Sequence, residues 1–144
     1  MAEKAGKILR VFPHRTKATP DDSMVRIGMP GFFEAEQYNS IQISVAFTWE
    51  KSYAEFLAEQ WEDYGPVTVG GPAYNDRGGD FVPGMYLKRG YVITSRGCPN
   101  NCWYCHAWKR EGTVRELPIT EGWLLQDNNI LACSEGHVRA VFAM

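Results

Sequence analysis

Three of the chain's four cysteines lie within eight residues, and no other sequence feature constrains the fold as strongly. The segment reads Ser95-Arg-Gly-Cys98-Pro-Asn-Asn-Cys102-Trp-Tyr-Cys105, which is a C-x3-C-x2-C pattern. Thiolates spaced this closely can surround a single metal centre. We therefore expect the fold to present this segment as one loop that holds a metal.

Composition and charge narrow the possible function classes. Hydrophobic residues make up 44% of the 144 residues and charged residues 22%, the balance of a globular protein. The net charge of −2 gives no electrostatic support for nucleic-acid binding. The first residues lack the apolar run of a secretory signal, and no stretch approaches the ~20 apolar residues of a membrane span. We expect a cytoplasmic protein, in which clustered cysteines serve metal or redox chemistry rather than disulfides.

The N-terminal half has the pattern of an α/β region. Residues 7–12 and 40–47 predict strands, because apolar and β-branched residues recur in them, and residues 13–22 predict a loop. Apolar residues at helical spacing predict a helix over 50–64, which Gly65 and Pro66 end. Residues 66–69 then predict a short strand. Strand, helix and strand in this order indicate a βαβ unit with parallel strands, which is a small Rossmann-like region.

The C-terminal half is less regular. Residues 73–90 are rich in glycine and predict a long loop, followed by a short strand over 90–94. Residues 106–121 are polar and irregular, and residues 122–126 predict another strand. Ser134 is a candidate N-cap for a last helix. The cysteine segment directly follows the strand at 90–94, and α/β folds place their sites at the carboxyl ends of parallel strands.

Three local thiolates suit an open metal centre better than a closed one. A cubane iron–sulfur cluster normally takes four cysteines, so three leave one iron without a protein ligand. An open coordination position is what a metal needs to bind a substrate or cofactor directly. Gly97, just before Cys98, relieves crowding where the backbone turns off the strand.

The pattern C-x3-C-x-aromatic-C after a strand resembles the signature of the radical SAM superfamily, with Tyr104 at the aromatic position. The resemblance implies that Cys98, Cys102 and Cys105 ligate a 4Fe-4S cluster and that S-adenosylmethionine (SAM) chelates the fourth iron. It also implies that the reduced cluster cleaves SAM to methionine and a 5′-deoxyadenosyl radical, which abstracts hydrogen from a substrate. Tyr104 would pack near the adenine. The implied partners are SAM, an external electron donor and an unidentified substrate.

Other residues are candidates for binding SAM. Some branches of the superfamily carry an Asp-Asp-Asn-like segment after the second strand, and this chain has Asp127-Asn128-Asn129 there. Asp127 or Asn128 can accept a hydrogen bond from the SAM amino group, and a polar turn or helix cap is an equally open interpretation. Four cations near the cysteines are further candidates for the SAM carboxylate: Arg96, Lys109, Arg110 and Arg115.

The N-terminal half also resembles a known domain. Residues 67–72, after the βαβ unit, are similar to part of the cobalamin-binding-like domain that precedes many radical SAM cores. The cobalt-ligating Asp-x-His-x-x-Gly segment of that domain is absent from this sequence, and His14 lacks its pattern. We expect a degenerate domain without cobalamin, in which His14 is a surface loop residue.

These patterns predict two regions: a Rossmann-like region over 1–89, and over 90–144 the start of a partial (β/α) barrel that carries the cluster loop. A full eight-unit barrel takes about 250 residues, far more than the second region provides. We therefore expect a radical SAM enzyme or a fragment of one, completed by a missing C-terminal portion or a complementing subunit.

The residues alone leave other metal sites open. A zinc site can use the three cysteines with His106 or Cys133, which gives a non-catalytic zinc or iron–sulfur module as the alternative function. Cys133 itself is expected to be buried, because free cysteine commonly behaves as a small apolar residue. It is left out of the cluster ligands, because a fourth cysteine would occupy the open position on the iron.

Overall fold

The computed structural model describes residues 6–144, and the chain divides into two compact units, Met1–Asp76 (unit 1) and Arg77–Met144 (unit 2). The sequence places the boundary between residues 89 and 90, whereas residues 77–89 belong to unit 2 in the structure. Gly78 ties this segment to unit 2, because its amide donates to the Glu111 carboxylate and its carbonyl accepts from Arg115.

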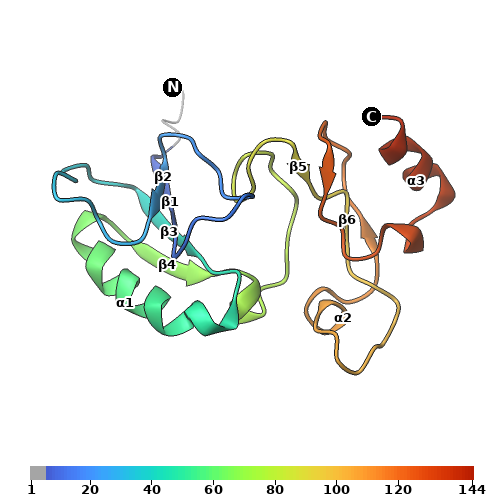
Figure 1. Ribbon diagram of the computed structural model, residues 1–144, viewed down its shortest axis with the longest axis horizontal. Coiled ribbons are helices and arrows are strands. Elements are labelled where there is room, and N and C mark those ends of the chain that lie inside the picture. Colours follow the sequence, from blue (N-terminus) through green and yellow to red (C-terminus); the bar gives the residue numbers. More distant parts are fainter. Residues whose placement is uncertain (1–5) are drawn as a thin grey trace. The chain divides into compact units, whose positions relative to one another are not determined.

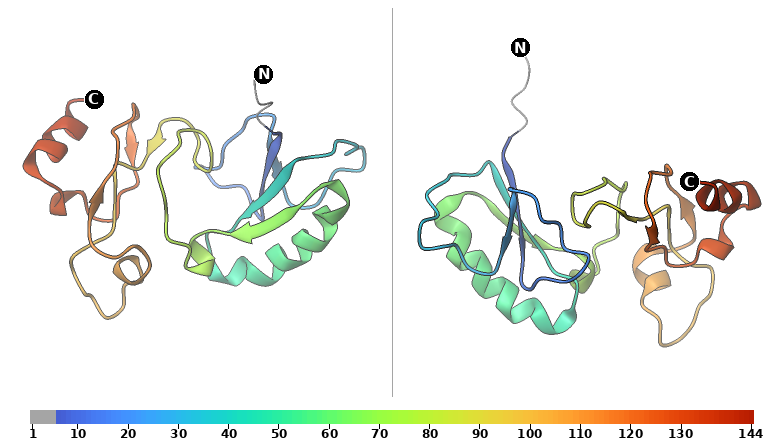
Figure 2. Two further views of the ribbon diagram at one scale, coloured as in Figure 1. Left: turned by 180° about the vertical axis from the view of Figure 1, so that it is seen from behind. Right: turned by 45° about the horizontal axis from the view of Figure 1, so that its top comes forward.

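Unit 1 is built on a four-stranded parallel sheet with the strand order β2-β1-β3-β4 (Figure 1). Its strands are β1 (Ile8–Phe12), β2 (Val25–Ile27), β3 (Ser40–Ser44) and β4 (Val67–Gly70). The helix α1 (Lys51–Trp61) connects β3 to β4 and lies along one face of the sheet (Figure 2). This arrangement confirms the expected α/β class and the parallel βαβ unit.

The core of unit 1 lies between α1 and the sheet. Ile41 and Ile43 alternate with half-buried polar residues along β3, so one face of the strand carries its apolar side chains inward. Leu57 and Trp61 of α1 are fully buried against them. The Trp61 indole N–H donates to the Gly28 carbonyl at 3.0 Å, which satisfies the one polar group that this large side chain brings into the core.

The strand β2 was not predicted from the sequence. It has three residues with charged Arg26 at its centre, so it shows no alternation that could reveal a strand. Its place in the sheet comes from pairing with β1, where Arg10 lies opposite Val25. Short 3-10 turns flank α1 and follow β4, at Thr48–Glu50, Glu62–Tyr64 and Pro72–Tyr74.

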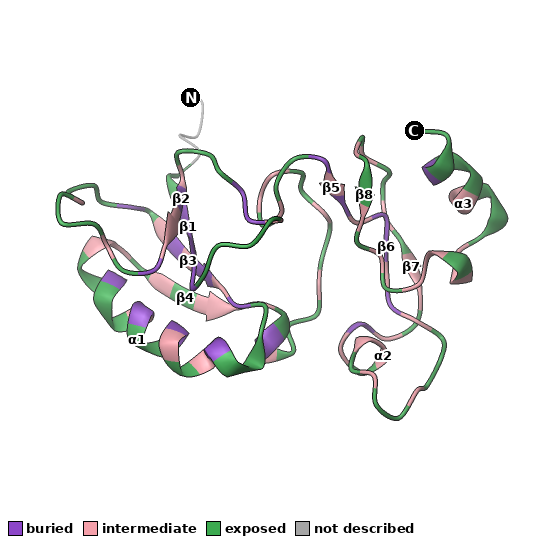
Figure 3. Cartoon of the chain, viewed as in Figure 1, coloured by how far each residue is buried: buried purple, intermediate pink, exposed green. Residues whose placement is uncertain are grey.

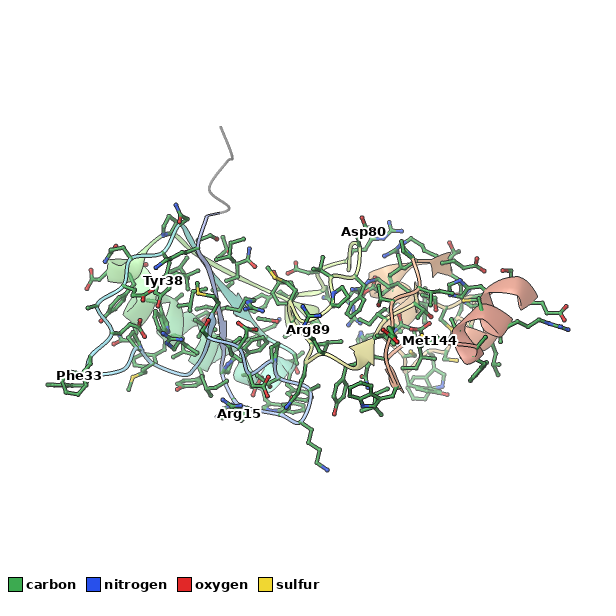
Figure 4. All side chains as sticks on the ribbon, turned by 90° about the horizontal axis from the view of Figure 1, so that it is seen from above. Arg15, Phe33, Tyr38, Asp80, Arg89 and Met144 are labelled. Atoms are coloured by element: carbon green, nitrogen blue, oxygen red, sulfur yellow. The ribbon has the colours of Figure 1, made fainter. Side chains whose placement is uncertain are left out.

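A polar network fixes the loop between β2 and β3. The Glu34 carboxylate accepts from Arg26 Nε at 2.8 Å and from the Tyr38 hydroxyl at 2.7 Å. The hydrogen bond from Arg26 lowers the pKa of Glu34, and burial raises the pKa of Tyr38 to about 12. Phe32 and Phe33, at the tip of the same loop, are almost fully exposed, and Figure 4 shows Phe33 projecting outward.

Unit 2 contains short elements only. Its strands β5 (Tyr91–Val92) and β8 (Leu124–Leu125) pair in parallel, and β6 (Ser95–Arg96) and β7 (Arg115–Glu116) pair antiparallel. Its helices are α2 (Ala107–Glu111) and α3 (Glu135–Phe142), with a 3-10 turn at Ile130–Ala132.

Unit 2 follows the sequence in part. The Ser134 side chain accepts from the His137 amide, which confirms the predicted cap of α3. The strand expected over 90–94 is shortened to β5, and β6 begins just after it, at Ser95. The segment expected to be irregular contains α2 and β7, which are too short to leave a periodic pattern. Over residues 77–144, which the structure describes in full, the two small sheets form no barrel.

Neither unit contains a membrane-spanning candidate: among the helices described, none combines the length and the apolar character that a bilayer requires.

Candidate functional site

The three clustered cysteines lie on one loop of unit 2, between β6 and α2, as the sequence predicts. We call Cys98–Cys105 the cysteine loop. Its entry is held by the Cys98 amide, which donates to the Gly112 carbonyl at 3.1 Å. Gly97 makes this approach possible, because it has a φ of +90° and a Cβ there would lie 2.2 Å from the Thr113 carbonyl oxygen. The loop therefore begins against the backbone that follows α2.

The far end of the cysteine loop is held by α2. The Cys102 carbonyl accepts from the Cys105 amide at 3.1 Å, which forms a turn, and from the Trp108 indole N–H at 2.9 Å. Between these fixed ends the segment Pro99–Asn101 is exposed. The loop is thus anchored at both ends, with its middle in solvent.

All four cysteines are free thiols and half-buried. Cys98, Cys102 and Cys105 supply the soft sulfur ligands that iron–sulfur clusters and zinc prefer, so the donor set fits such a centre. Over residues 6–144, however, no three His, Cys, Asp or Glu side chains are gathered closely enough to hold a metal ion. A metal bound by all three thiols therefore requires their sulfur atoms to lie closer together than they do in this structure.

The segment Asp127–Asn129 contacts the strand and loop that lead to Cys98. Both Asp127 oxygens are engaged, by the Thr94 amide at 2.7 Å and by the hydroxyls of Thr94 and Ser95 at 2.8 and 2.5 Å. Asn128 Oδ1 accepts from the Gly97 amide at 2.9 Å. The polar atoms proposed to bind SAM from Asp127 and Asn128 thus bond within the chain.

The next residue of that segment touches a cysteine. Asn129 Nδ2 donates to the Cys98 sulfur at 3.4 Å. The sequence places Asn129 after a predicted strand but shows nothing that pairs it with Cys98, because the two residues are 31 positions apart.

Tyr104, expected near the SAM adenine, is largely exposed. Its ring packs edge-to-face on Trp103, with 5.5 Å between the ring centroids, and Trp103 is exposed as well. The two rings present aromatic surface to solvent beside the cysteines.

A buried carboxylate organises the cations near the loop. Glu111, at the end of α2, is 2% exposed and accepts from Arg110 Nε at 3.0 Å and from Arg115 at 3.3 Å. The Arg96 guanidinium lies 4.0 Å from the same carboxylate; burial lowers its pKa, and the charge of Glu111 opposes this effect. Arg96 also donates to the Gly79 carbonyl. Glu111 therefore joins these three arginines in one ion-pair cluster of unit 2. Nothing in the sequence indicated this role of Glu111.

The other candidate metal ligands, His106 and Cys133, do not form a cluster of potential ligands with the cysteine loop in the described residues. His106 is exposed at the N-terminal end of α2, and Cys133 follows the 3-10 turn before α3, where its amide donates to the Ile130 carbonyl. In unit 1, His14 is exposed and its Nδ1 bonds Glu50 at 2.8 Å.

A small pocket of unit 2 is lined by two charged residues and by several apolar and aromatic ones: Asp80, Arg96, Phe81, Val82, Met85, Tyr86, Leu87 and Ile93. Its volume of about 80 Å³ is well below the ~300 Å³ of a typical small-molecule site.

Comparison with models of known protein families finds none that matches the chain. Comparisons with curated proteins and with solved structures find no match either.

Proposed function

We propose that this chain is a radical SAM protein, or the cluster-bearing part of one, in which Cys98, Cys102 and Cys105 ligate a 4Fe-4S cluster. The observation that carries the proposal is the C-x3-C-x2-C pattern of free thiols on one anchored loop, directly after a strand. Three thiolates leave one iron open for SAM. When bound, such a cluster supplies one electron to the SAM sulfonium, and cleavage of a carbon–sulfur bond gives methionine and the 5′-deoxyadenosyl radical.

The residues around the loop have roles that the contacts support. β5 and β8 pair in parallel. In this proposal they correspond to the first two strands of a (β/α) barrel, and the cysteine loop and the Asp127–Asn129 segment belong to the connections that follow them. Gly97 and Trp108 hold the two ends of the loop that carries the three sulfurs. The exposed ring of Tyr104 offers a stacking surface for the adenine of SAM.

Asp127 and Asn128 support the loop in this proposal and do not recognise SAM. Their side-chain oxygens already accept hydrogen bonds from Thr94, Ser95 and Gly97, and these bonds fix the backbone that leads into Cys98. We also propose that unit 1 is a degenerate Rossmann-like domain that binds no cobalamin, since its sequence lacks the cobalt-ligating segment.

The test is anaerobic reconstitution with iron and sulfide, followed by electron paramagnetic resonance of the reduced protein with and without SAM. The expected result is about four irons per chain, as cubane stoichiometry requires, and a reduced-cluster spectrum that changes when SAM is added. Cys102→Ala should lose the cluster, because two ligands of the loop remain. The matched control is Cys133→Ala, which removes a half-buried thiol outside the loop and should keep the full iron content.

One observation favours a second candidate, a metal-binding module that does not use SAM. Asp127 and Asn128 already accept hydrogen bonds within the chain, so the two predicted acceptors for the SAM amino group are partly occupied. This candidate predicts a zinc protein, or a cluster whose spectrum does not respond to SAM. Either result would reject the radical SAM proposal, and iron content with an unchanged spectrum would establish the iron–sulfur form of the module.

A further inference from the structure

Each residue of the Asp127–Asn129 segment forms a side-chain hydrogen bond with the residues that lead into the cysteine loop. Asp127 bonds Thr94 and Ser95, Asn128 bonds the Gly97 amide, and Asn129 bonds the Cys98 sulfur. Successive side chains of one segment therefore fix successive positions of the other, and the last of them reaches a metal-ligand atom.

Asn129 is held in place independently of this contact. Its carbonyl accepts from the Ala132 amide at 3.2 Å, which closes the 3-10 turn Ile130–Ala132, and its side chain is half-buried. Because its backbone is fixed at the turn and Asn128 is fixed on Gly97, the amide N–H of Asn129 is directed at the Cys98 sulfur at little further entropic cost.

The three cysteines differ in this respect. Within residues 6–144, Cys98 is the one of the three whose sulfur accepts a side-chain N–H, from Asn129, whereas Cys102 and Cys105 form hydrogen bonds through their backbone atoms. An N–H directed at a ligating sulfur stabilises the negative charge that an added electron places on the cluster and its thiolates.

We propose that Asn129 is a positioning residue that donates a hydrogen bond to the Cys98 sulfur and raises the reduction potential of the cluster bound there. This inference rests on the proposed function, because it requires a cluster on the cysteine loop. It gives the chain a means to set how easily an electron donor reduces its cluster, one electron passing from the donor to the oxidised cluster.

The experiment compares Asn129→Leu with the unchanged protein after reconstitution, using a redox titration followed by electron paramagnetic resonance. Leu has the branched shape of Asn, with a larger volume and no donor, so the midpoint potential should move to a more negative value while iron content is retained. The matched control is Gln126→Leu, which also replaces a side-chain amide by Leu at an exposed position of unit 2 outside the cysteine loop and should leave the potential unchanged.

A second variant covers the case in which Asn129→Leu loses its cluster. Asn129→Asp keeps the shape and replaces the donor by a carboxylate, so it should shift the potential further in the negative direction than Gln126→Glu does. If the Asn129 and Gln126 variants have the same midpoint potential as the unchanged protein, the inference is overturned and the proposed cluster stands. If the unchanged protein assembles no cluster, the proposed function fails, and this inference fails with it.

Discussion

Gly97 controls how the chain enters the cysteine loop. Its φ of +90° lies in the region that glycine adopts without strain, and the Thr113 carbonyl occupies the space where a side chain would stand. From the sequence, this glycine is expected to relieve crowding where the backbone turns off the strand. The close approach of residues 112 and 113 becomes visible only in the fold.

Gly97→Ala is expected to destabilise unit 2 by at least about 1–3 kcal/mol, the cost of a residue held in a sparsely populated backbone region. A Cβ on residue 97 would lie 2.2 Å from the Thr113 carbonyl oxygen, so the backbone after α2 would also have to shift. The measurement is the free energy of unfolding from urea denaturation. Gly136→Ala is the control, because Gly136 lies within α3 with no atom within 4 Å of its Cβ position, and it should stabilise the protein by about 1 kcal/mol. Equal effects of the two changes would contradict the role of Gly97.

At the scale of elements, Glu111 joins α2 to both neighbouring segments of unit 2. Its carboxylate receives Arg110 and Arg115 and the Gly78 amide, so one side chain connects the helix, β7 and the segment 77–79. Three arginines surround this one buried carboxylate, so removal of its charge leaves them without their shared ion-pair partner.

Glu111→Gln is expected to lower the free energy of unfolding by about 3 kcal/mol, the lower end of the cost of breaking a buried ion pair, because Gln keeps the shape and one acceptor. The control is Glu135→Gln, which breaks the exposed pair with Arg139 on α3 and should cost about 0–1 kcal/mol. Urea denaturation measures both. A Glu111 variant as stable as the Glu135 variant would show that the arginine cluster contributes nothing to stability.

At the scale of the whole chain, apolar burial is unequal between the units. Unit 1 contains a continuous buried cluster that includes Leu9, Ile41 and Trp61, whereas Val92 and Val141 are the buried apolar side chains of unit 2 (Figure 3). Unit 2 also leaves several large apolar side chains exposed, among them Trp103, Trp123, Leu131 and Phe142. Because apolar burial is the main stabilising contribution to folding, unit 1 should be the more stable part.

Hydrogen exchange of the full chain without metal should therefore protect the β3 amides of unit 1 far more than any amides of unit 2. Metal binding to the cysteine loop adds its binding free energy to the folding of unit 2. Reconstitution with iron and sulfide should slow exchange by at least tenfold around Cys98 and residues 112–116, and leave β3 unchanged. Equal protection of the two units before reconstitution would contradict the prediction that unit 1 is more stable than unit 2.

Local sequence patterns were sufficient for several parts of this protein. The alternation in β3, the helical spacing of α1 and the side chain of Ser134 each act within a few residues, so their structures could be predicted from the chain alone. The spacing of Cys98, Cys102 and Cys105 likewise identified the candidate ligands before any fold was known.

Only the tertiary structure decided how that loop is supported. β2 joins the sheet through backbone pairing with β1, Glu111 meets Gly78 across 33 positions, and Asn129 meets Cys98 across 31. Such contacts leave no periodic signal, because they depend on which distant segments the folded backbone brings within hydrogen-bond distance. The sequence by itself therefore determined which atoms can bind a metal, and the fold determined which neighbours position them.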